Sequence, residues 1–199
     1  MPQISPTEFY ALPLRVHAFL ADIPLHDVWA VDLPAHRDGV TLSEFLRRVN
    51  QNGSEAAYAK INRFPPVARA LFSLRFFLGR IFRLEVEPKD AVTASFGRRL
   101  TPEDFAGSLV SPGTPEGLFR VVYRFENEQL LEIQNRTVHA AALSALAQKA
   151  DNYRFYFAVY VRQRTWITHL YMGIIDPFRK RVIYPALLKT IRATWDQNI

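Results

Sequence analysis

The chain contains no cysteine in its 199 residues. It therefore has no disulfide framework, no thiol nucleophile and no thiolate metal site. It also lacks any apolar run approaching the ~18 residues that span a bilayer. Its start, Met-Pro-Gln-Ile-Ser-Pro, lacks the charged and apolar blocks of a secretory signal. These absences predict a soluble cytoplasmic protein.

Several motifs of catalysis and cofactor binding are missing as well. The sequence contains no P-loop, no G-x-S-x-G elbow and no G-x-G-x-x-G fingerprint. Its five histidines form no helical i, i+4 pair and no H-x-H strand pair, which are the usual spacings of metal ligands. We therefore expect no metal site and no cofactor.

The positive charge is spread evenly along the chain. The net charge is +6, with 13 basic and 10 acidic residues in positions 1–100 and 12 basic and 9 acidic residues in positions 101–199. Proteins that bind nucleic acids usually concentrate their charge on one face or one arm. We therefore expect no nucleic-acid partner.

Two helices are predicted in the first half of the chain. Thr41 and Glu44 have capping-box spacing and would open a short helix. Residues 66–84 carry a continuous apolar stripe, while Phe72 and Phe76 fall among arginines on the opposite face. That second face is either a further buried contact or a surface for a partner or a weak membrane-surface contact. Residues 1–25 contain four prolines and are expected to be irregular.

From residue 118 the apolar period changes to two, which is typical of strands. Short connections between these strands indicate an antiparallel meander. Three glutamates, Glu126, Glu128 and Glu132, flank one predicted hairpin and are expected to form a solvated rim. The predicted strands are 26–33, 119–126, 128–134, 138–148, 153–162 and 165–175.

The chain ends in a predicted helix that begins after Asp176, a good N-cap residue, with Pro177 in the first turn. Pro185 falls inside this helix and should bend it. We expect one α+β domain over residues 1–199, in which the apolar stripe of this helix packs on the concave face of the sheet. The stripe contains Ile183, Tyr184, Leu187, Leu188, Ile191 and Trp195.

Three stretches suggest a relationship: residues 66–75, residues 136–144 and residues 171–179. The most specific part is the Pro177-Phe178 pair at the head of the last helix. Together with the order of the elements over residues 26–196, the sequence resembles the START, Bet v and polyketide-cyclase (SRPBCC) superfamily. Within it, the stretches look like a branch described only as a domain of unknown function. The resemblance implies a helix-grip fold, in which a curved antiparallel β-sheet wraps around a long C-terminal α-helix.

This resemblance also implies a cavity between the sheet and the last helix, but no agreed reaction. Members of the branch also occur joined to reductase-like nucleotide-binding domains, whose glycine motif this chain lacks. The family pattern often has histidine after the Pro-Phe pair, whereas this sequence has Arg179. Any chemistry of that histidine would be lost here.

Alternation in residues 153–162 separates an apolar face from an arginine–tyrosine face. Cavity linings are mostly apolar, so the apolar face should point inward, and Arg154 and Arg162 should lie outside and make no ligand contact. His139 and His169 are the candidates for a polar anchor. The expected ligand-binding residues are Tyr123, His139, Phe155, Phe157, Val159, Trp166, His169, Tyr184 and Leu188.

Three functions fit these features. The first is a hydrophobic cavity that binds a small apolar or aromatic molecule without turnover. The second is an enzyme of the cyclase, aromatase or dehydratase kind, which needs polar groups in the same cavity. The third is a membrane-surface or interaction protein that uses the face around Phe72. For the second function, one of His139, His169, Tyr123 or Tyr171 must point inward.

Overall fold

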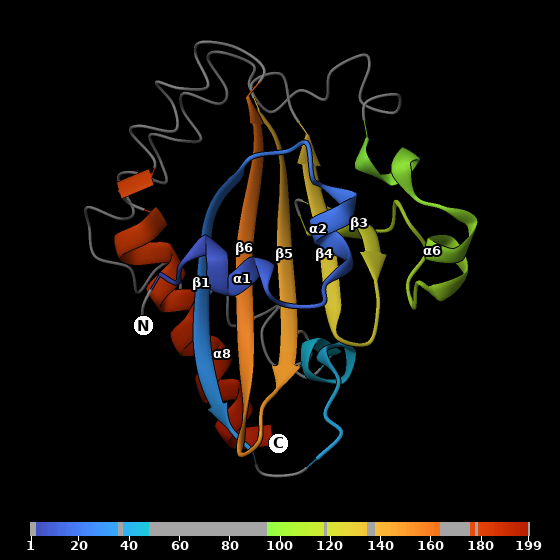
Figure 1. Cartoon of the computed structure of the whole chain (residues 1–199). Coiled ribbons are helices and arrows are strands. Elements are labelled where there is room, and N and C mark those ends of the chain that lie inside the picture. The colour runs from blue at the N-terminus through green and yellow to red at the C-terminus, as the bar shows by residue number, and fades with distance from the viewer. Residues whose placement is uncertain are drawn as a thin grey trace.

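The computed structural model describes residues 3–35, 38–47, 95–117, 119–134, 138–163, 176–177 and 179–198. Its centre is an open, six-stranded antiparallel sheet with the order β1-β6-β5-β4-β3-β2, and helices make the fold a mixed α/β one (Figure 1). The strands are β1 (Leu25–Pro34), β2 (Pro115–Glu116), β3 (Phe119–Arg124), β4 (Glu128–Gln134), β5 (Val138–Gln148) and β6 (Asn152–Gln163).

Five of the predicted strands are thus confirmed within one or two residues at each end, because their period of two is long and regular. The predicted strand at 165–175 and the predicted helix at 66–84 lie outside the described residues, and so do Trp166, His169, Phe72 and Phe76. The expected membrane-surface contact involves that helix, so it also concerns residues outside the described ranges.

The side chains of β6 alternate between the two faces of the sheet. Phe155, Phe157 and Val159 point to one side, which we call the α8 face, and the alternate residues Tyr156 and Tyr160 point to the other, the N-terminal face. Successive side chains of a strand point to opposite faces, so this division continues into β1 through the β1–β6 register.

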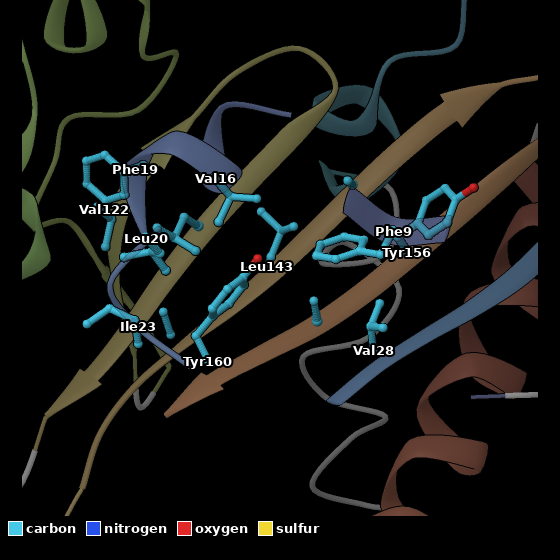
Figure 2. Packing of buried hydrophobic residues seen from close by; sticks show 14 of the residues in the cluster. Phe9, Val16, Phe19, Leu20, Ile23, Val28, Val122, Leu143, Tyr156 and Tyr160 are labelled. Carbon is cyan, nitrogen blue, oxygen red and sulfur yellow. The ribbon is translucent and has the colours of Figure 1, made fainter. Parts of the chain in front are cut away.

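The N-terminal face is covered by two short helices, α1 (Pro6–Tyr10) and α2 (Arg15–Phe19), as Figure 1 shows. Phe9 and Val16 from these helices are fully buried against the sheet, and Phe9 lies beside Tyr156 (Figure 2). The prediction that residues 1–25 are irregular is wrong here, because Pro6 occupies the first turn of α1 behind its N-cap Ser5 instead of breaking a helix.

The arginine–tyrosine face of β6 is consequently not the outer surface that alternation predicts. Tyr156 and Tyr160 are each only 1% exposed under the N-terminal helices. Arg154 pairs with Glu8 on α1, and Arg162 pairs with Asp22, which follows α2. These two arginines flank the buried tyrosines and tie the N-terminal layer to the sheet.

The α8 face is covered by α8 (Tyr184–Asn198), a helix of 15 residues, which packs against β1. Trp195 is fully buried, contacts the rings of Phe45 and Tyr153, and donates a hydrogen bond from Nε1 to the Pro34 carbonyl at 2.7 Å. Leu187 is 36% exposed, so its predicted place in the buried stripe is wrong. Within the described ranges, no helix has the length and apolarity needed to cross a membrane.

The entry into α8 is irregular. A π-helical turn, η2 (Arg179–Ile183), comes directly before it. Pro185 has no N–H to give to the carbonyl four residues earlier, and a wider turn is one way in which a helix accommodates such a missing bond. This turn places Arg179 beside the N-terminal end of α8.

Candidate functional site

The candidate site lies on the α8 face, where β1 carries Asp27 and Trp29. In the β1–β6 register, Asp27 is opposite Val159 and Trp29 is opposite Phe157. The register shifts between Leu25 and Asp27. A bulge of this kind re-aims side chains, and it allows the neighbouring residues His26 and Asp27 to reach the same group of polar residues.

Three aromatic rings from separate elements meet beside these residues. The Tyr184 ring at the start of α8 lies 5.6 Å from the Trp29 ring and 5.4 Å from the Phe157 ring, measured between centroids. Both pairs are close to edge-to-face, the arrangement that the ring quadrupoles favour. We call Trp29, Phe157 and Tyr184 the aromatic trio.

Four polar side chains meet next to the aromatic trio. Arg179 Nη2 lies 3.2 Å from Asp27 Oδ2 and 3.5 Å from Asp176 Oδ1. His26 Nε2 lies 2.7 Å from Asp176 Oδ2 and 3.9 Å from Asp27 Oδ2. The Arg179 guanidinium also lies over the Tyr184 ring, 5.3 Å from its centroid. We call His26, Asp27, Asp176 and Arg179 the polar anchor.

The polar anchor is buried at one end and accessible at the other. The Asp27 side chain is 0% exposed, whereas the side chains of Arg179, Asp176 and His26 are 16%, 19% and 23% exposed. Asp27 therefore lies at the base of the cluster, and the three other residues are in contact with solvent.

Burial leaves a polar deficit at this base. Asp27 Oδ1 and Trp29 Nε1 are buried and have no hydrogen-bond partner among the described residues. Burial raises the pKa of Asp27 above its usual range, although the charges of Arg179, His26 and Lys180 oppose that rise. Buried polar groups are nearly always hydrogen-bonded, so these two atoms need an explanation.

The predicted ligand-binding residues divide between the two faces. Phe155, Val159 and Leu188 belong to the same buried cluster as the aromatic trio, which itself contains Phe157 and Tyr184. Tyr123 and His139 lie on the N-terminal face, because Tyr123 packs in the other cluster and His139 stacks on Phe96 of that cluster. The structure thus brings five of the nine together and separates two, while Trp166 and His169 lie outside the described residues.

His139 is part of a cluster on the N-terminal face centred on Glu132. Its Nε2 lies 3.2 Å from Glu132 Oε2, and Glu132 also accepts hydrogen bonds from the Ser95 hydroxyl and from Phe96 N–H at 2.9 Å. Ser95 and His139 both contact the carboxylate rather than each other, so this is no nucleophile–base pair. Glu132 instead holds η1 (Phe96–Arg99) on the sheet.

Glu128 has a similar place beside α2. It accepts a hydrogen bond from Arg15 N–H at 3.0 Å, and Arg15 also binds Asp104 of α6 (Pro102–Gly107) through two guanidinium nitrogens. Burial raises the pKa of Glu128 to about 7. The predicted solvated rim is therefore wrong for Glu128 and Glu132, which are 5% and 6% exposed, and correct for Glu126 alone.

The sequence comparison assigns a family. Residues 19–186 match the family described as "Protein of unknown function (DUF2867)". The chain belongs to the DUF2867 family. No curated protein and no solved structure matches the chain. The DUF2867 match extends from before β1 to the beginning of α8, so it includes every residue of the aromatic trio and of the polar anchor.

Sequence reasoning on this DUF2867 member missed Trp29 and all four residues of the polar anchor as site residues. Alternation along β1 places Asp27 and Trp29 on one face with Val31. Every strand alternates in this way, so the pattern alone does not mark these residues as a site. The pairing of Arg179 with Asp27 joins positions 152 residues apart, and no local pattern reports it. Across the described part of the chain, no group of three or more potential metal ligands has a geometry that would hold an ion.

Proposed function

We propose that this protein binds a small aromatic or apolar molecule on the α8 face, beside the aromatic trio. The observation that carries the proposal is the pair of buried polar atoms without partners, Trp29 Nε1 and Asp27 Oδ1, next to three aromatic rings. A ligand that combines an apolar body with a polar group would meet both needs. Small-molecule sites commonly have this composition, a mainly apolar lining with a few placed polar groups.

The exposure of the anchor supports the same proposal. His26, Asp176 and Arg179 are partly exposed, and Phe157 is only partly buried, so a ligand would approach from their side. Asp27 and Trp29 would then meet the innermost part of the ligand. Phe155, Val159 and Leu188 would contribute apolar contacts deeper in the same cluster.

The architecture is the second support. A six-stranded antiparallel sheet with a C-terminal helix across one face is compatible with the helix-grip arrangement of the SRPBCC superfamily. We propose that this DUF2867 chain is a cytoplasmic member of that arrangement, with its ligand between the sheet and α8. Tyr123 and His139 are left out of the proposed site, because they lie on the other face.

The test is Phe157→Trp, read out by binding of an environment-sensitive apolar dye and by urea unfolding. If a ligand space lies beside Phe157, the larger ring enters it, so dye binding falls while the free energy of unfolding changes little. In a filled core the same change overpacks and costs about 1–3 kcal/mol.

Phe105→Trp is the matched control, since Phe105 on α6 is 52% exposed. It should leave both dye binding and stability unchanged. A wild-type protein that binds no dye, together with a clearly destabilised Phe157→Trp variant, would overturn the proposed function.

A further inference from the structure

We infer that the ligand of the α8 face is an aromatic carboxylate. Its carboxylate group replaces Asp27 as the ion-pair partner of the Arg179 guanidinium. The inference rests on the proposed function and names the class of molecule that the site selects. Three features support it: the hydrogen-bond donors of Arg179 and Trp29, the position of the Arg179 charge, and the burial of the Asp27 carboxylate that the ligand would displace.

Two hydrogen-bond donors lie around one ring. Arg179 stacks over Tyr184 at 5.3 Å, and the Trp29 ring contacts the same Tyr184 ring at 5.6 Å. Trp29 Nε1 has no acceptor among the described residues. A carboxylate has two oxygens that accept hydrogen bonds, and charge-assisted bonds to guanidinium are about twice as strong as neutral ones. A carboxylate bound to Arg179 would therefore keep lone pairs that can accept from the Trp29 N–H.

The position of Arg179 argues against a cationic ligand. Aromatic rings beside a carboxylate often bind ammonium groups through cation–π contacts. Here the Tyr184 face is already taken by the Arg179 guanidinium, and Lys180 adds a second positive charge close to Asp27. A cation placed on Arg179 would face two like charges. A ligand carboxylate that takes the place of Asp27 would be attracted by both, and Asp176 is the negative charge that remains beside it.

Asp27 is a carboxylate that a ligand can displace from Arg179. Its side chain is fully buried, and the groups that face it are Arg179 and Lys180 from η2, His26 from β1, and Asp176. Burial already raises the pKa of Asp27. When a ligand carboxylate binds Arg179, Asp27 takes a proton from solvent, and its new O–H donates a hydrogen bond to the ligand carboxylate. The number of buried ion pairs stays the same.

The experiment compares three probes that share one ring and differ in charge: benzoate, benzamide and benzyltrimethylammonium. Their dissociation constants are measured by NMR titration against the full chain at low salt. We expect benzoate to bind about tenfold more tightly than benzamide, and the cation to bind least.

Three variants of the anchor region then assign the preference. Arg179→Gln should remove the advantage of benzoate over benzamide. Asp27→Asn removes the competing carboxylate and should tighten benzoate binding about fivefold. Arg181→Gln is the matched control, because Arg181 is an exposed arginine of the same turn, and it should change neither value. The opposite signs at Arg179 and Asp27 keep the inference testable if one variant fails to fold.

The outcomes separate the two proposals. Equal binding of benzoate and benzamide, or tighter binding of the cation, overturns the carboxylate inference and leaves the binding function standing. Binding of none of the probes or of the apolar dye overturns both. A benzoate preference that survives in Arg179→Gln also overturns the inference, because the anion is then held elsewhere.

Discussion

The two faces of the sheet bury carboxylates in different ways. On the N-terminal face, Glu128 and Glu132 each accept a backbone N–H from a short helical turn, at Arg15 and at Phe96. On the α8 face, the contacts of the Asp27 carboxylate within the described residues are with side chains, Arg179 and His26, and both of these are partly exposed. Carboxylates fixed to backbone amides hold elements in place, whereas one held by movable side chains can exchange partners.

This difference suggests a structural role for the buried carboxylates of the N-terminal face and a binding role for Asp27 on the α8 face. Removing Glu128 or Glu132 would detach part of the covering layer, because each carboxylate binds the start of a short helix. Asp27 differs because its main partner is an arginine side chain, and none of the described backbone N–H groups depends on its carboxylate. The predictions below test whether the N-terminal face is structural and the α8 face functional.

The largest effect is expected for Trp195→Ala, which should lower the free energy of unfolding by about 3–5 kcal/mol. Trp195 is fully buried between Phe45 and Tyr153 and anchors α8 to Pro34. Urea unfolding measures the loss. Leu187→Ala, on the exposed side of the same helix, is the control and should cost less than about 1 kcal/mol. Equal losses would contradict the assigned orientation of α8.

Glu132→Ala should cost about 2–3 kcal/mol at pH 7, because it leaves Phe96 N–H and the Ser95 hydroxyl without their acceptor. Burial acts to raise the pKa of Glu132, but hydrogen bonds from His139, Ser95 and Phe96 outweigh it and lower the pKa. The stabilisation by Glu132 is therefore present at neutral pH and lost as the pH falls below about 4. Unfolding of both proteins at pH 7 and pH 3 measures this, and a gap that widens on acidification would contradict it.

Glu128→Gln should show the opposite sign, with a gain of about 2 kcal/mol at pH 8. Burial raises the pKa of Glu128 to about 7. The wild-type protein therefore loses stability as the pH rises from about 4.5 to 7, where the unfolded chain ionises first. Glutamine keeps the acceptor for Arg15 N–H without the charge. The gain should vanish near pH 4, and exposed Glu126→Gln should show none.

The smallest effect is expected for Arg162→Gln. Arg162 pairs with Asp22 near the surface, where the two side chains are 38% and 57% exposed. Exposed pairs of this kind contribute less than about 1 kcal/mol. Urea unfolding and benzoate titration should both give wild-type values. A change in benzoate binding would place an anion site on the N-terminal face and break the proposed division of roles.

Much of the sheet was predictable because its signal is local. Alternation in β6 correctly placed Phe155, Phe157 and Val159 on one face. The burial of Glu128 and Glu132 could have been found from the same period, since both share a face with the buried Leu130.

The rest was not predictable because it depends on contacts between distant positions. That Tyr156 and Tyr160 are buried follows from α1 and α2, helices of five residues whose stability comes from the sheet that they cover. The polar anchor likewise needs β1 and η2 to meet across the α8 face. Composition cannot report which arginine meets which aspartate.

The distance between partners also sets the order in which the chain assembles. The N–H of Arg15 bonds to Glu128, which lies 113 positions later in the chain. At ~5–20 residues per second, synthesis of that stretch takes on the order of ten seconds. During that interval Phe9 and Val16, fully buried in the finished protein, have no sheet to cover. These apolar residues therefore stay uncovered until β4, β5 and β6 have been synthesised, and α8, which is made later still, covers the opposite face last.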